Sequence, residues 1–428
     1  MLGEQFLENP KFQDFLTKNF VLYQATIQEP AGDAIFKKFA IRATPTVMVL
    51  DGDGSEVDWV VGYDPPAEKF QERIGQMTAG VDTFKSLSAA YAKNPKDEAT
   101  IFKLAQKWSD RYNDAKSQEK YKEILALDPD GKLGTTEFQK EKVSYTEYAE
   151  YNLGLGTLRA RPPVPASILA FIKKYPESSM VKEAFRNLAS AYFGRTAPKD
   201  EAVKFFEEYT ARYAQDPLVL GAYVRRIIQD KDNLDKGLVL AQKAVDLAQG
   251  GAKIPMLQSL AQVHLLKGDK AKAAETAEKI VALDAEGISA MMTMAPEGAP
   301  SGPVFANLMN AARIFVEADK LDRALAVFGP DFLKKNLAKA DAVSRYASFW
   351  SSQNKNLESA LEAAKKAVEL TPDAFAVWNT LSQVHLKMKN YDEAIKAAQK
   401  AVDVAPTEQL KERFRKQIEQ IKAEKEKK

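Results

Sequence analysis

Cysteine is absent from this sequence, and histidine occurs only twice. The first absence excludes disulfides, thiolate metal sites and a cysteine nucleophile, and the scarcity of histidine argues against a metal centre built from several histidines. Long hydrophobic runs are also missing, since no stretch approaches the roughly 18 apolar residues that a membrane-spanning helix needs. We therefore expect no metal, no cofactor and no membrane partner.

The chain has 428 residues, of which 45% are hydrophobic and 28% are charged. This composition is typical of water-soluble globular proteins, and the length predicts about three domains or a repeat array. Basic residues are concentrated at 411–428, where eight of them stand against four acidic residues. We interpret this run as a solvated terminal helix rather than a nucleic-acid arm, and we expect no nucleic-acid partner.

The C-terminal part of the sequence repeats itself at an offset of 34 residues. Residues 357–372 align with residues 391–406, and each copy has apolar or small residues at i, i+3, i+4 and i+7 before a closing proline. This spacing predicts one buried face of a helix, and Ala360 and Ala394 predict close helix contact. A second apolar stripe, beginning at Trp378, completes a pair of antiparallel helices.

The repeated unit resembles the tetratricopeptide repeat. Six positions carry that family's pattern: Trp378, Leu381, His385, Ala394, Ala401 and Pro406. Ser382 stands where the family usually has a small glycine or alanine. The resemblance implies stacked helix pairs that form a solenoid, with a concave groove for an extended peptide or for a helix of a partner protein.

Residues 1–80 have a different pattern. A strand is predicted at residues 20–27 and a helix at residues 31–39. The apolar runs on either side of the Asp-Gly turn at residues 51–54 predict a β-hairpin, and a final helix is predicted from Ala67.

This order of elements, with Thr44-Pro45-Thr46 before the hairpin, resembles the C-terminal part of the thioredoxin fold. The resemblance implies that Pro45 follows a cis peptide bond. A sharp bend of this kind leaves the backbone around Thr44 free to pair with an extended peptide.

The sequence departs from the thioredoxin family at its decisive point, because it contains no Cys-x-x-Cys. Two interpretations stay open. In the first, the domain is a binding or packing element without redox activity, in a chain that is cytoplasmic as written. In the second, the cysteine pair lies upstream of Met1, and the natural protein is a thiol–disulfide oxidoreductase, periplasmic or exported.

We predict a mostly α fold, in which a partial thioredoxin-like α/β domain precedes a tetratricopeptide-like α-solenoid. Two Gly/Pro-rich segments, residues 154–165 and 287–303, predict linkers or broken turns. The predicted domains are a partial thioredoxin-like domain at 1–80, divergent repeats at 81–286, a linker at 287–303, C-terminal repeats at 304–410 with units at 341–374 and 375–408, and a charged helix at 411–428.

The predicted function is that of a non-catalytic interaction scaffold, which binds a peptide or protein partner through the groove of its helical repeats. His264 and His385 occupy the same repeat phase, which favours packing over catalysis, and no catalytic residue is assigned. The candidate peptide-binding residues are Thr44, Pro45, Gln258, Gln262, Arg345, Asn379, Gln383 and Lys387. Whether the parent protein is an enzyme stays open.

Overall fold

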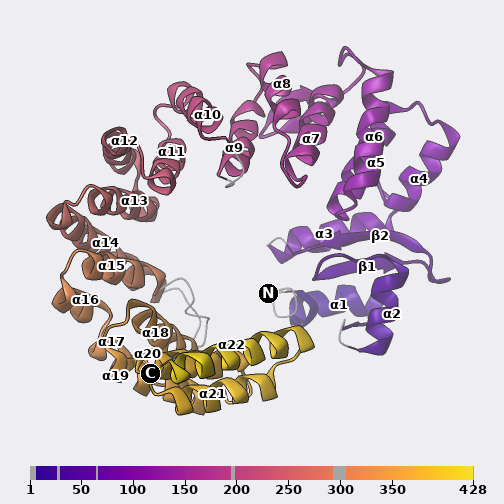
Figure 1. The fold of residues 1–428 in the computed structure, drawn as a ribbon. Helices are drawn as coiled ribbons and strands as arrows, with labels where there is room; N and C mark the ends of the chain where they lie inside the picture. The colour runs from indigo at the N-terminus through magenta and orange to yellow at the C-terminus, as the bar shows by residue number, and fades with distance from the viewer. Residues whose placement is uncertain (1–5, 27–28, 64–65, 194–197, 293–304, 428) are drawn as a thin grey trace. The chain divides into compact units, whose positions relative to one another are not determined.

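The computed structural model contains helices along most of the chain, as predicted, and two small antiparallel sheets, of which the sequence predicted the first (Figure 1). The described residues are 6–26, 29–63, 66–193, 198–292 and 305–427. They form two compact units, Met1–Ala202 and Val203–Lys428. Each unit is described separately below.

The first unit begins with the thioredoxin-like segment. Its elements are α1 (Pro10–Asn19), α2 (Pro30–Lys38), β1 (Thr46–Leu50), β2 (Glu56–Val61) and α3 (Ala67–Thr78). Strands β1 and β2 pair in antiparallel register with Val47 opposite Val60, which confirms the predicted hairpin. The Gly62 N–H donates to the Pro45 carbonyl at 2.8 Å and extends this pairing by one step. Apolar residues of α1, α3 and the hairpin form one core, including Phe12.

The strand predicted at residues 20–27 does not form within the described residues. Phe20–Thr26 has no strand assignment, and residues 27–28 lie outside the described part. A strand requires a neighbour for its backbone hydrogen bonds, and β1 pairs only with β2 in the described residues. Val21 is consequently 100% exposed.

The remainder of the first unit is helical apart from a second hairpin, which the sequence did not predict. Its elements are α4 (Phe84–Lys93), α5 (Glu98–Asp110), α6 (Asp114–Leu127), β3 (Thr135–Phe138), β4 (Glu141–Ser144), α7 (Tyr145–Leu158), α8 (Ala166–Lys174) and α9 (Val181–Tyr192). The linker predicted from Gly154 is wrong in its first part, because α7 continues through this residue. A Cβ atom at Gly154 would lie 2.6 Å from Ile168 Cδ1, so glycine here permits α8 to approach closely.

The second unit consists of successive helix pairs. Its elements are α10 (Lys199–Arg212), α11 (Pro217–Asp230), α12 (Leu234–Leu247), a 3₁₀ turn η2 (Gly250–Ala252), α13 (Lys253–Leu266), α14 (Lys270–Met292), α15 (Ala306–Glu317), α16 (Leu321–Phe328), α17 (Pro330–Lys335), α18 (Ala340–Gln353), α19 (Leu357–Leu370), α20 (Phe375–Lys387), α21 (Tyr391–Val404) and α22 (Glu408–Glu426).

The spacing of these helices reproduces the predicted repeat. Helices α19 and α21 begin 34 residues apart, at Leu357 and Tyr391. The predicted linker at 287–303 overlaps the end of α14, which continues to Met292, and residues 293–304 lie outside the described part. The predicted domain boundaries stay predictions.

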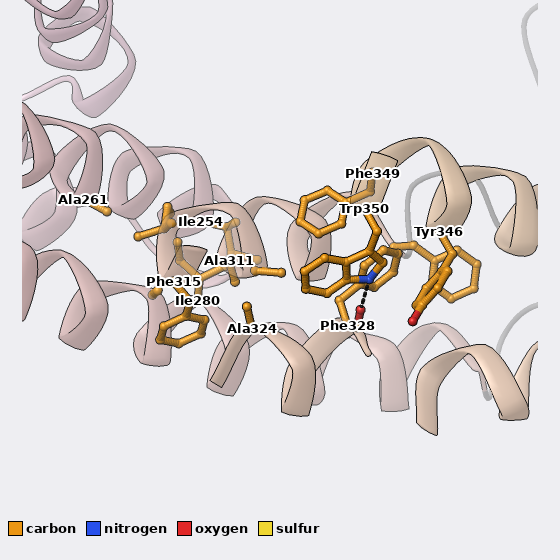
Figure 2. Close-up of a cluster of buried hydrophobic side chains, with 14 of the residues drawn as sticks. Ile254, Ala261, Ile280, Ala311, Phe315, Ala324, Phe328, Tyr346, Phe349 and Trp350 are labelled. Carbon is orange, nitrogen blue, oxygen red and sulfur yellow. Dashed lines mark hydrogen bonds between the residues drawn. The ribbon is translucent and has the colours of Figure 1, made fainter. Parts of the chain in front are cut away.

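The core of the second unit contains both small residues and large aromatic residues, and four of the aromatic residues, Phe328, Tyr346, Phe349 and Trp350, lie together (Figure 2). Ala261, Ala311 and Ala324 are fully buried at helix contacts, where a larger side chain would hold the helices apart. Phe328 at the end of α16 and Trp350 of α18 are also fully buried, and the indole Nε1–H of Trp350 donates to the Phe328 carbonyl at 2.7 Å. This bond satisfies a carbonyl at the end of α16 that has no partner within its own helix.

Candidate functional site

The first helices of the pairs in the second unit form a continuous row. Helices α11, α13, α15, α18 and α20 each contact the next member of the row, in this order. We call their combined polar surface the first-helix face. Six of the predicted site residues lie on this row: Gln258 and Gln262 on α13, Arg345 on α18, and Asn379, Gln383 and Lys387 on α20.

A hydrogen bond connects α13 and α15 on this face. The Arg313 Nη1–H donates to Gln262 Oε1 at 3.1 Å and also to Glu317 Oε1 at 2.6 Å. Arg313 was not among the predicted site residues. No repeat pattern marks its position, and only the packing of α13 against α15 brings it to Gln262.

Arg345 lies on α18 and is exposed. Its Nε–H donates to Asp341 Oδ1 at 2.8 Å, one helical turn away. An exposed pair of this kind contributes little to stability, so Arg345 can exchange Asp341 for a carboxylate of a ligand. Between α18 and α20, the hydroxyl oxygens of Ser348 and Thr380 lie 3.2 Å apart and connect the two helices.

Asn379, Gln383 and Lys387 recur every four residues and form one stripe along α20. Asn379 and Gln383 are half-buried, whereas Lys387 is exposed. The amide oxygen Oδ1 of Asn379 is buried and has no hydrogen-bond partner among the described residues. Because an unpaired buried oxygen is costly, a rotation of this half-buried amide toward a ligand N–H would be stabilising.

His264 and His385 lie inside the helix pairs, as their shared repeat phase predicts. They are 7% and 8% exposed, and Nδ1 of each is buried without a hydrogen-bond partner among the described residues. Burial lowers the pKa of both imidazoles below the ordinary value. They pack within the repeats and do not contribute to the first-helix face.

Thr44 and Pro45 form a separate candidate surface in the first unit. Both residues are exposed, and the peptide bond between them is cis. The backbone N–H and C=O of Thr44 have no hydrogen-bond partner among the described residues. This surface and the first-helix face belong to different units, so they are treated as two sites.

A cavity of about 320 Å³ lies in the first unit, between β4 and the loop after α8. It is lined by residues 141–143 and 175–179 with Glu147, and none of the predicted site residues borders it.

Within the described part of the chain, no three side chains of the metal-binding types cluster closely enough to hold an ion. No described helix is long and apolar enough to span a bilayer.

Comparisons with known proteins match two parts of the chain. Residues 1–78 match the family model of the thioredoxin-like domain, and residues 303–427 match the ChAPs, which are Chs5p-Arf1p-binding proteins. No curated protein matches the chain.

Solved structures similar to the chain include YrrB, described as a TPR protein with an unusual peptide-binding site. It is 15% identical, with 49% of this chain and 97% of YrrB covered and a TM-score of 0.26. The APC/C hetero-tetramer Cut9-Hcn1 is 13% identical, with coverage of 79% and 58% and a TM-score of 0.33. Residues 1–78 match the thioredoxin-like family model, and later helix pairs recur at 34 residues. The chain therefore combines a thioredoxin-like domain with tetratricopeptide-like helical repeats.

Proposed function

We propose that the chain is a non-catalytic scaffold that binds a peptide or protein partner along the first-helix face. The observation that carries this proposal is the buried, unpartnered amide oxygen of Asn379, which lies on a row of contacting helices beside Gln383 and Lys387. Stacked helix pairs of this kind bind extended peptides or helices of other proteins.

Two further facts support a binding role. The chain has no cysteine, so it cannot itself exchange thiols and disulfides through a dithiol pair. The family that matches residues 303–427 is named for binding two proteins, Chs5p and Arf1p. We extend only the class of partner, a protein, from that family to this chain.

The chemistry of the face defines how a peptide would be held. A backbone N–H of the peptide would donate to Asn379 Oδ1, and a carboxylate would pair with the ammonium of Lys387 or with the guanidinium of Arg345. The amide of Gln258 lies at the position on α13 that is equivalent to Asn379 on α20, 121 residues earlier. Repetition of polar groups on successive helices suits a ligand that extends along the row.

The exposed backbone of Thr44 provides a second surface for an extended peptide, through strand-like pairing next to the hairpin. In this surface, the backbone supplies the hydrogen bonds, and the cis bond at Pro45 shapes the bend. Binding there would be insensitive to substitutions on α20, so the two surfaces can be tested independently.

The test uses the full chain and a library of immobilised peptides, followed by fluorescence anisotropy with the best binder. We expect Asn379→Leu to weaken binding by about tenfold, which corresponds to one lost hydrogen bond of about 1.4 kcal/mol. The matched control is Gln399→Leu, which removes an exposed amide from the second helix α21 and should leave the affinity unchanged. Equal affinities for both variants and the unsubstituted chain would refute the proposal for this face.

A further inference from the structure

Two acidic side chains lie where the start of α5 and the end of α6 adjoin the turn at residues 128–134, which leads into the β3–β4 hairpin. Glu98 is the first residue of α5, and Asp128 caps the end of α6. They are only 6% and 4% exposed. Asp128 Oδ2 accepts from the Leu133 N–H, and Glu98 Oε2 lies beside the next residue, Gly134, so the two carboxyl groups are neighbours at this turn. Two buried carboxylates in contact repel each other strongly unless one of them carries a proton.

Asp128 is the member of this pair that is ionised. Its Oδ1 accepts from the Lys132 N–H at 2.8 Å and its Oδ2 from the Leu133 N–H at 2.9 Å, while the Thr146 hydroxyl donates to its backbone carbonyl. Burial raises the pKa of Asp128, but these two backbone N–H groups and the contact with Glu98 outweigh burial, and the pKa is below the ordinary value. Asp128 therefore holds the turn that leads into β3 and the start of α7.

Glu98 has the opposite surroundings. Neither of its carboxyl oxygens receives an N–H or O–H from the described residues. Burial, and then the charges of Asp128 and Asp97, raise its pKa to about 7. The nearest cation on the turn, the Lys132 ammonium, is paired with Asp130 at 2.9 Å.

The turn and α7 also contact Glu98 from the side of the hairpin. A Cβ atom at Gly134 would lie 3.3 Å from Glu98 Oε2 and only 2.3 Å from the ring of Tyr145, so a residue with a side chain does not fit at this position. Tyr145, the first residue of α7, stacks on Phe102 of α5 at 4.3 Å between ring centroids. The carboxyl group of Glu98 therefore lies beside the segment that carries the hairpin and α7.

We propose that Glu98 and Asp128 share one proton that closes the β3–β4 hairpin onto α5, and that loss of this proton as the pH rises to neutral loosens the junction. The Glu98 hydroxyl donates to the Asp128 carboxylate in the closed form. When the proton leaves to water, two carboxylates face each other with Asp97 beside them, and no described cation pairs with Glu98. Opening of the turn relieves this repulsion because Glu98 then gains water.

The direction and range of the pH effect follow from the two states of Glu98. In the open form it ionises at the ordinary value for a glutamate, near 4.3, and in the closed form at about 7. The closed form therefore loses stability as the pH rises from about 4.3 to about 7, and it loses no more above that value. A structural role without titration would give a stability of the closed form that does not change over this pH range.

The test is hydrogen–deuterium exchange of the full chain at residues 128–146, corrected for the intrinsic pH dependence of amide exchange. Protection should fall by several tens of fold between about pH 5 and pH 8 and level off above neutral pH. Glu98→Gln, whose neutral amide can still donate to Asp128, should have the same protection throughout this range. The control Glu137→Gln, which changes an exposed carboxylate of β3, should behave like the unsubstituted chain.

A second variant covers the case in which Glu98→Gln does not fold. In Asp128→Asn the charge that binds the proton is absent, so the decline in protection should move to lower pH. If Glu98→Gln or Asp128→Asn follows the same pH profile as the unsubstituted chain, the shared proton is refuted.

Discussion

Arg111 at the end of α5 is buried against Asp58 of strand β2, with Arg111 Nη2 3.0 Å from Asp58 Oδ1. The two residues are 3% and 0% exposed, and the guanidinium carbon lies 4.0 Å from the ring centroid of Phe84 and 4.9 Å from that of Trp59. A charged pair in apolar surroundings therefore joins the thioredoxin-like hairpin to the first predicted helix pair. The N-terminal segment is an integral part of its unit.

Asp58→Asn should strongly destabilise the first unit. The substitution removes the fully buried carboxylate that pairs with Arg111 and Lys107, so that within the described part of the chain Arg111 keeps only Glu56, whose Oε1 accepts from Arg111 Nη2 at 2.5 Å. Nε and Nη1 of Arg111 already have no hydrogen-bond partner among the described residues. Breaking a buried pair in this way costs about 3–5 kcal/mol. The measurement is urea unfolding followed by the fluorescence of the tryptophans.

The matched control is Asp82→Asn, which breaks the exposed pair between Asp82 and Lys103. Both side chains of this pair are about half exposed, so the ion pair contributes little. Asn also tolerates the left-handed backbone at position 82, so the free energy of unfolding should fall by less than about 1 kcal/mol. Similar losses for the two variants would show that Asp58 has no special role at the junction.

Trp350→Phe should destabilise the second unit by about 2–4 kcal/mol. Trp350 is fully buried, so the smaller ring leaves a void, and the Phe328 carbonyl loses the donor that satisfies it. The measurement is the thermal unfolding temperature by circular dichroism. In the control Trp378→Phe the lost bond, from Nε1 to the Pro372 carbonyl, is at an exposed position, and the shift should be much smaller.

Local sequence signals predicted much of this fold. The Asp-Gly turn between two apolar runs predicted the hairpin, and the 34-residue offset predicted the helix pairs. Both signals are local, because the residues that form each hairpin or helix pair are close together in the sequence. Contacts between distant segments were not predictable. The glycine at position 154 gives room to Ile168, which lies on another helix, and the bond from Arg313 to Gln262 depends on how α13 packs against α15. Residues 20–26 have strand composition but no neighbouring strand among the described residues.

The two histidines predict a loss of stability of the second unit in acid. Burial lowers the pKa of His264 and His385 in the folded chain, whereas in the unfolded chain each ionises near its ordinary value of about 6.5. Stability should therefore be constant above about pH 6.5 and fall below it, by at most about 1.4 kcal/mol per pH unit for each histidine. The measurement is urea unfolding at several pH values.

Substitution identifies the source of this acid sensitivity. His385→Leu places an apolar side chain at the same repeat position and removes the titrating group. The free energy of unfolding should then depend less steeply on pH, and the double variant with His264→Leu should have the weakest pH dependence. Asp269, which lies 4.0 Å from His264 Nδ1, partly offsets burial at His264, and Glu393 does the same at His385, so each histidine should contribute to the slope. An unchanged slope in the double variant would contradict this assignment.

Helix α22 combines a charged surface with a buried stripe, and Phe414→Ala tests the importance of that stripe. Phe414, Ile418 and Ile421 are buried against α21 at helical spacing, although basic residues surround them. Removing the Phe414 ring exposes apolar surface of α21 and should cost about 3–5 kcal/mol. The control Arg413→Ala changes an exposed neighbour and should be close to neutral. Hydrogen exchange of α21 provides the measurement: its protection should fall in Phe414→Ala alone, and unchanged protection would show that α22 is the solvated helix that its charge first suggests.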